Sequence, residues 1–259
     1  MKRQTKIHLV NGAFWFSLIA LFAYHLFGST TIPRDYRSLF GNSSKTGDHP
    51  ATITSADSGK NDDPGVLPEQ VLNQATFVSQ APFANWDAVH EETCEEAAVI
   101  IARLYRQGRK EISADEAEKE LMAMVRYQEE HYGGAHDITA QEITRLAADF
   151  YGEDGYEVVT SFTLADLKQY VSQGNLIIVP AAGRVLENPN FKQPGPLYHV
   201  LVITGYDDKK QQFITNDPGT RKGFGFRYSY KNLMESIHDF PGEKEKILEG
   251  APAVIIVGK

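Results

Sequence analysis

The spacing of apolar residues changes about halfway along the chain. Between residues 94 and 151, apolar positions recur every three or four residues, which is typical of amphipathic helices. After residue 155, they form short runs bounded by glycine, proline and polar residues, which is typical of strands. Helices followed by strands predict an α+β domain with an N-terminal helical half and a C-terminal antiparallel sheet.

Four predicted helices share one start signal, a serine or threonine followed three residues later by an acidic residue, as in a capping box. Glycines near their far ends supply stop signals. The helices are expected over residues 94–107, 114–132, 140–151 and 164–173. The first opens at Thr93 and Glu96, which places Cys94 in its first turn.

Short apolar and β-branched runs in the second half predict the strands. They cover residues 156–160, 176–180, 199–206, 212–216, 226–228 and 253–257, with a short helix expected over 230–237. The unbroken apolar run from residue 176 indicates a strand buried on both faces. Residues 207–210 read as a turn, so the runs on either side of it are expected to form a hairpin.

The N-terminal 28 residues form a separate element. Lys2, Arg3 and Lys6 precede an apolar stretch of roughly 19 residues, about enough to cross a bilayer as a helix. The basic end predicts a cytoplasmic N-terminus, hence a single-pass anchor in the cell membrane with the folded domain on the extracytoplasmic side. A cleaved signal peptide is the alternative.

Residues 29–75 contain few apolar side chains, and Gly, Ser, Thr, Asp and Pro dominate residues 41–65. A segment of this composition buries too little surface to fold, so we expect a flexible linker. The predicted organisation is therefore an anchor over 1–28, a linker over 29–75 and one folded domain over 76–259.

Composition narrows the function classes. The 259 residues carry a formal net charge of −8 and no basic run, which argues against nucleic-acid binding. Cys94 is the only cysteine, so no disulfide can form within the chain. No pair of metal ligands follows the His90 and Cys94 pair at zinc-like spacing, and we predict neither a metal nor another cofactor.

A thiol at a helix N-terminus is easier to ionise, and the thiolate is a nucleophile. Such a cysteine needs a base, and the best-placed candidate is His199 at the start of the predicted hairpin. A turn centred near Asp208 would place His199 opposite Asp217, with Cβ atoms roughly 4.5–5.5 Å apart. A register shifted by one residue would place Asn216 there, and either side chain can orient a histidine.

Together these residues resemble the peptidase C39-like family of papain-fold cysteine peptidases. The residues that carry the resemblance are Gln80, Trp86, the run Cys94-Glu95-Glu96-Ala97-Ala98, the strand that begins at His199 and ends in Gly205-Tyr206, and Asn216-Asp217-Pro218. It covers roughly residues 76–240. It implies a papain-like fold and hydrolysis of a peptide or protein substrate by a Cys-His-Asp triad.

The resemblance assigns a role to each candidate residue. Cys94 is the nucleophile, His199 the base and Asp217 the group that orients the histidine, while Gln80 donates to the oxyanion hole beside the backbone N–H of Cys94. Trp86 either lines a substrate groove or, as we expect, anchors its loop on the core.

Two features depart from the family pattern. Glu95 stands where the family usually has glycine, and the spacing from Gln80 to Cys94 is long, so the intervening loop must bulge. Glu92, Glu95 and Glu96 also oppose ionisation of the thiol. These acids support one alternative, a non-catalytic module that binds peptides or a partner. A third possibility is acyl transfer to an amine by the same triad.

Overall fold

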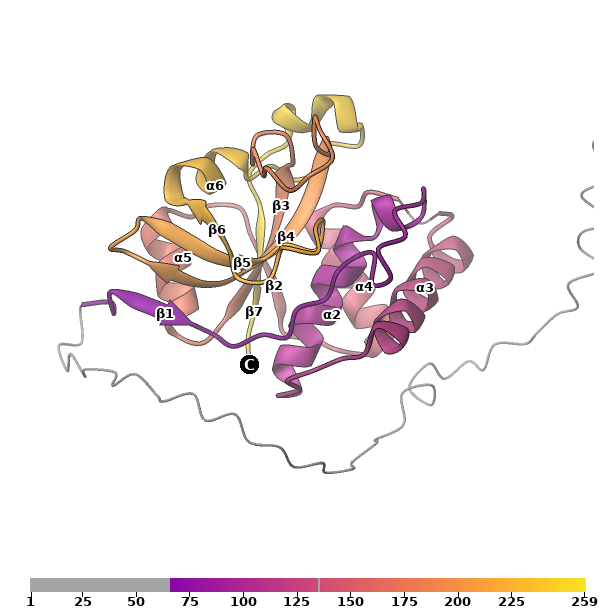
Figure 1. The fold of residues 1–259 in the computed structure, drawn as a ribbon, viewed down its shortest axis with the longest axis horizontal. Coiled ribbons are helices and arrows are strands. Elements are labelled where there is room, and N and C mark those ends of the chain that lie inside the picture. The colour runs from indigo at the N-terminus through magenta and orange to yellow at the C-terminus, as the bar shows by residue number, and fades with distance from the viewer. Residues whose placement is uncertain (1–65, 135) are drawn as a thin grey trace, which may run out of the picture. The chain divides into compact units, whose positions relative to one another are not determined.

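The computed structural model describes residues 66–134 and 136–259. Within them the N-terminal half is helical and the C-terminal half is an antiparallel sheet, so the predicted α+β class is confirmed (Figure 1). The main helices are α2 (Cys94–Arg106), α3 (Ala114–His131), α4 (Ala140–Tyr151), α5 (Leu164–Ser172) and α6 (Tyr230–Ser236). Two short 3₁₀ helices are η2 (His90–Glu92) and η3 (Lys244–Glu249).

The sheet has the strand order β2-β7-β3-β4-β5-β6, and β1 pairs with β4. The strands are β1 (Gln70–Leu72), β2 (Tyr156–Val159), β3 (Leu176–Ala182), β4 (Tyr198–Asp207), β5 (Gln212–Asn216), β6 (Phe226–Ser229) and β7 (Val254–Val257). All residues of β3 and β4 are buried, as the unbroken apolar run of β3 predicts. Figure 1 shows α2, α3 and α4 on one side of the sheet and α5 and α6 on the other.

Three of the four predicted N-terminal helix caps form. The hydroxyls of Ser113, Thr139 and Thr163 each accept the expected backbone hydrogen bond. Thr93 makes no such cap: its hydroxyl donates instead to the carbonyl oxygens of Gln80 (3.1 Å) and His90 (3.3 Å). The predicted box at Thr93 is therefore wrong, because this hydroxyl fastens the preceding loop to the start of α2.

The predicted hairpin forms, but in a different register. Asn216 pairs with Val202, so neither Asn216 nor Asp217 is the direct cross-strand partner of His199. Two features shift the pairing. The turn is centred between Lys209 and Lys210, one to two residues later than expected, and a bulge at Thr204 adds an unpaired residue to β4.

Strand β1 lies inside the segment expected to be linker. Its Val71 pairs with Tyr206, and the adjacent Asn73 side chain donates to the carbonyl oxygens of Val171 (2.9 Å) and Asn175 (3.0 Å). The folded part of the chain therefore begins before residue 76. Three paired residues at the end of a polar stretch carry too little pattern for the sequence to reveal them.

Among the described residues, no helix has the length and apolar character that crossing a membrane requires. The expected anchor over residues 1–28 and most of the expected linker lie outside the described residues.

Candidate active site

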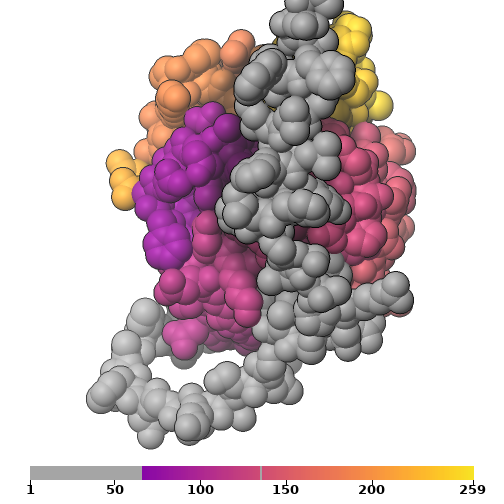
Figure 2. Space-filling view, turned by 90° about the vertical axis from the view of Figure 1, so that its right-hand side faces the viewer, coloured from indigo at the N-terminus to yellow at the C-terminus, as the bar shows by residue number. Residues whose placement is uncertain are grey.

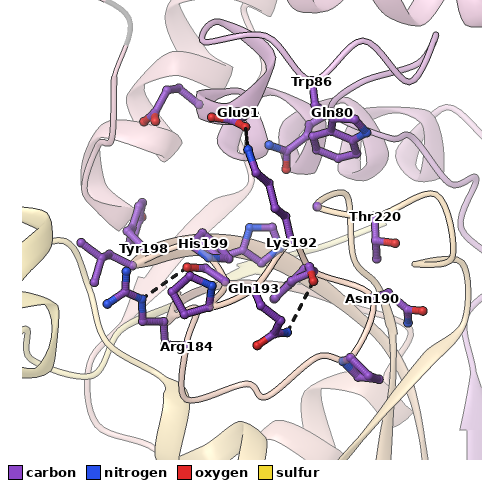
Figure 3. Close-up of a pocket in the computed structure, with 18 of the residues that line it drawn as sticks. Gln80, Trp86, Glu91, Arg184, Asn190, Lys192, Gln193, Tyr198, His199 and Thr220 are labelled. Carbon is purple, nitrogen blue, oxygen red and sulfur yellow. Dashed lines mark hydrogen bonds and ion pairs between the residues drawn. The ribbon is translucent and has the colours of Figure 1, made fainter.

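A pocket of about 830 Å³ opens where three loops meet the start of β4. The loops are residues 80–92 before α2, residues 184–197 between β3 and β4, and residues 219–222 after β5. Figure 2 shows the first of these, in purple, beside the second, in orange. His199 lies inside the pocket with Gln80 across from it (Figure 3).

His199, which lines this pocket, forms a buried pair with Asp217. The ring Nε2 of His199 lies 2.8 Å from Asp217 Oδ1, and the two residues are 2% and 0% exposed. The sequence therefore identified the correct partner through an incorrect register. Asp217 follows the last residue of β5, and the turn that begins there directs its carboxylate back toward the ring. This contact leaves Nδ1 as the nitrogen available to a nucleophile.

The Asp217 carboxylate accepts three further hydrogen bonds. Oδ1 accepts from the backbone N–H of Gly219 (3.0 Å), and Oδ2 accepts from Tyr228 (2.5 Å) and Asn188 (2.9 Å). Burial alone would raise the pKa of Asp217, but the charge of His199 and the hydrogen bonds from His199, Tyr228 and Gly219 outweigh burial and hold that pKa below its ordinary value. The carboxylate is therefore a fixed anion that orients the histidine.

Sequence reasoning missed the residues around this pair. Asn188 and Tyr228 come from a loop and from β6, and nothing in their local pattern distinguishes them from other polar and aromatic residues. Gly219 could have been found more easily, because a glycine directly after Pro218 indicates a turn. A Cβ there would lie 2.7 Å from His199 Cε1, so the close approach of the turn to the ring requires glycine.

Cys94 begins α2, as predicted, but it is 3% exposed and its thiol is turned toward an acid. Sγ donates to Glu95 Oε2 at 3.0 Å, while Glu95 Oε1 accepts from the backbone N–H of Ile138 (3.2 Å). Within residues 66–134 and 136–259 the structure records no hydrogen bond from Cys94 to His199. The sequence thus places Glu95 correctly as a neighbour of the thiol, and the structure shows that this carboxyl is buried.

The surroundings of Cys94 favour the neutral thiol. Burial raises the pKa of the thiol well above its ordinary value, and the charges of Glu95 and Asp137 raise it further, while a hydrogen bond with the Val200 backbone acts in the opposite direction. That bond also places the sulfur against β4, beside the residue that follows His199. In the arrangement observed, burial and the neighbouring acids keep the pKa of the thiol high although Cys94 begins a helix.

More acids lie behind the thiol. Burial raises the pKa of Glu96 to about 7 and that of Asp137 to about 6. Glu96 accepts a hydrogen bond from Gln128 on one oxygen, and its other oxygen has no partner. Lys244 forms ion pairs with both Asp137 (3.1 Å) and Glu92 and is the cation that faces this group.

Gln80 lines the pocket, but its amide is partly engaged. Nε2 donates to the carbonyl oxygen of His90 (2.7 Å), and the buried Oε1 has no partner. A side-chain amide carries two N–H groups, so one remains for a ligand. The long spacing before Cys94 is explained by the extra turn η2, in which the His90 ring lies between Asp87 (2.8 Å) and Glu118 (3.1 Å).

Trp86 does not pack into the core. It is 37% exposed and lines the pocket, so the expectation that it anchors its loop on the core is wrong. The loop before α2 is held in place instead by the polar contacts of His90 and Thr93.

The chain belongs to the Peptidase_C39 like family, whose model matches residues 71–240, well over half of its length. This is a family of cysteine peptidases, which are hydrolases that act on peptide or protein substrates. The predicted family is therefore confirmed. A search of curated protein sequences found no match.

Two solved structures are similar to this chain at low identity. One is described as a C39-like peptidase from Bacillus anthracis, with 12% identity, a TM-score of 0.44, and coverage of 73% of this chain and 98% of that one. The other is xylellain, a cysteine protease from Xylella fastidiosa, with 12% identity, a TM-score of 0.37, and coverage of 82% and 95%.

Proposed function

We propose that the domain is a papain-like cysteine peptidase in which Cys94 is the nucleophile, His199 the base, Asp217 the orienting group and Gln80 an oxyanion donor. The observation that carries the proposal is the buried His199–Asp217 pair facing a pocket, with the only cysteine of the chain at a helix start beside the same strand. A histidine fixed through Nε2 has the geometry of a general base.

The catalytic state differs from the observed one by a rotation of the thiol. Cys94 has to leave Glu95 and approach His199 Nδ1, which would take its proton. Pairing with the resulting imidazolium can lower a cysteine pKa by several units and so offset the acids behind it. The hydrogen bond between Cys94 and the backbone of Val200, the residue after His199, supports this step.

Each bond change in the reaction can be assigned to a residue. The thiolate attacks the substrate carbonyl carbon, and the oxyanion receives hydrogen bonds from the free Gln80 Nε2–H and the backbone N–H of Cys94. The imidazolium of His199 gives its proton to the leaving amine, which departs as the C–N bond breaks. Water, deprotonated by the same ring, then hydrolyses the thioester and restores the thiol.

The second candidate is a peptide-binding module without catalysis. The observation that favours it is the hydrogen bond from Cys94 to buried Glu95, which engages the thiol proton and helps to raise the pKa of the thiol.

Thiol labelling separates the two candidates, because Cys94 is the only reactive thiol in the chain. For a peptidase we expect rapid labelling by iodoacetamide near neutral pH, slowed at least about tenfold by His199→Ala. The exposed His131→Ala is the matched control and should leave the rate unchanged. A slow labelling rate that is the same in the wild type and in His199→Ala would favour the binding module.

We also propose that residues 1–28 anchor the domain on the extracytoplasmic side of the cell membrane, with the N-terminus in the cytoplasm. The support is the apolar stretch after Lys2, Arg3 and Lys6. The full-length protein should remain with membranes after a high-salt wash, and a mature N-terminus after Ser29 would instead identify a signal peptide.

A further inference from the structure

The charges that line the pocket are not balanced. Its three acids are all paired: Glu91 with Lys192 (3.6 Å), and Glu92 and Asp137 with Lys244. The remaining lining cations are Arg184, Arg221 and Lys222, and within the described part of the chain none of these three forms an ion pair. Their side chains are exposed, so their charges face the solvent of the pocket mouth.

These three cations flank the histidine on two sides. Arg184 follows Gly183, where a Cβ would lie 3.2 Å from the Cβ of His199. Arg221 and Lys222 come just after Gly219, where a Cβ would lie 2.7 Å from His199 Cε1. The two backbone segments that carry the charges therefore approach the same side chain, one at its Cβ and the other at its ring.

The local charge is opposite to that of the whole molecule. The chain has a formal net charge of −8, so its general field repels acidic ligands. Five basic side chains line the pocket against three acidic ones, so the pocket mouth carries a local excess of positive charge. Within about 10 Å at 0.1 M salt, such charges attract a carboxylate before screening removes the effect.

We infer that the pocket selects peptides that carry acidic side chains close to the bond presented to His199. The inference has two parts, binding and cleavage. Cleavage rests on the proposed peptidase function, whereas binding of the acidic peptide does not require catalysis. The Arg184, Arg221 and Lys222 side chains would hold the substrate's carboxylates, and Arg offers them paired N–H donors. A basic peptide would be repelled by the same residues.

Cleavage and binding are measured separately with the full-length chain. Three peptides share one sequence and carry Glu, Gln or Lys on both sides of a central apolar residue; each is acetylated and amidated, so side chains supply the only variable charge. Turnover is followed with the wild type, and binding to the Cys94→Ala protein is followed by fluorescence anisotropy. A fourth peptide, with Gln and a free C-terminus, tests whether a terminal carboxylate suffices.

We expect the Glu peptide to bind and to be cleaved at least about tenfold better than the Lys peptide at low salt, with the difference shrinking as salt rises. Arg221→Gln combined with Lys222→Gln should reduce the ratio at least about threefold. The control, Lys209→Gln with Lys210→Gln, makes the same charge change in the β4–β5 turn and should leave the ratio unaltered.

Each other outcome is decisive. Equal binding of the Glu and Lys peptides, or an equal loss of preference in both double variants, would overturn the inference. Tight binding of the free-C-terminus peptide alone would assign the cations to a chain terminus and also overturn it. Preferential binding of the Glu peptide without cleavage of any peptide would sustain the inference and refute the peptidase function.

Discussion

At the scale of single residues, Glu95 decides the state of the thiol. Its carboxyl is 1% exposed and bridges Cys94 Sγ to the backbone N–H of Ile138. Burial, together with the charges of Glu96 and Asp137, raises the pKa of Glu95 well above its ordinary range. This group therefore changes charge under conditions where surface glutamates stay ionised, and it does so in contact with the candidate nucleophile.

Replacing Glu95 by glutamine should activate the thiol. The amide keeps the shape of the side chain and can still accept from Ile138, but it cannot ionise and it offers Sγ an N–H donor. Both changes favour the thiolate, so the pKa of Cys94 should fall. The labelling rate at pH 7 should rise at least about threefold, since one pKa unit corresponds to a tenfold change in thiolate fraction.

The control for this change is Glu91→Gln, which removes an acid from the pocket mouth without touching Cys94. Its labelling rate should stay close to that of the wild type. If Glu95→Gln leaves the dependence of labelling on pH unaltered, the carboxyl does not govern the thiol.

At the scale of elements, the sequence could predict those features that depend on residues close together in the chain. The caps of α3, α4 and α5 were predictable because a hydroxyl and an amide three residues apart decide them. The register of β4 and β5 was not, because the turn lies one to two residues later than expected and the bulge at Thr204 shifts the pairs beyond it by one residue. The partners of Asp217 were also hidden, since Asn188 and Tyr228 reach it only after β5, β6 and the loop after β3 have assembled.

Strand β1 gives the clearest test of packing between elements. A Cβ at Gly205 would lie 2.3 Å from the Val71 carbonyl oxygen, so Gly205→Ala should push β1 away from β4. We expect the free energy of unfolding to fall by about 1–3 kcal/mol, as in other overpacked sites. Urea denaturation of a chain that begins at Val66 measures it.

Gly258→Ala is the matched control, because a Cβ there meets Asn175 Oδ1 at an ordinary 3.7 Å. It should change stability far less than Gly205→Ala. Equal losses in the two variants would mean that β1 adds little to the fold.

At the scale of the whole molecule, several buried groups combine to set the dependence of stability on pH. Burial raises the pKa of Glu96 from 4.5 to about 7 and that of Asp137 from 3.8 to about 6. Burial acts to lower the pKa of His90, but hydrogen bonds from its ring to Asp87 and Glu118 raise it overall. All three pKa values are higher in the folded state, so the unfolded chain loses these protons first as pH rises.

The stability from these groups is therefore complete below their unfolded pKa values and is lost as pH rises through their folded ones. Asp217 acts in the opposite direction, since its lowered pKa gives stability that is lost only below about 3.8, the ordinary aspartate value. We expect the free energy of unfolding to be greatest near pH 4.5–5 and to decline toward pH 8, by up to about 1.4 kcal/mol per pH unit for each proton released.

Glu96→Gln tests the origin of this decline. The amide cannot ionise, so urea denaturation of the variant between pH 5 and pH 8 should show a shallower fall than the wild type. The exposed Glu249→Gln removes the same charge from the surface and should leave the slope intact. A wild-type stability that rises from pH 5 to pH 8 would show that Glu96 and Asp137 are solvated in solution, and that the acids behind Cys94 do not hold its thiol in the neutral form.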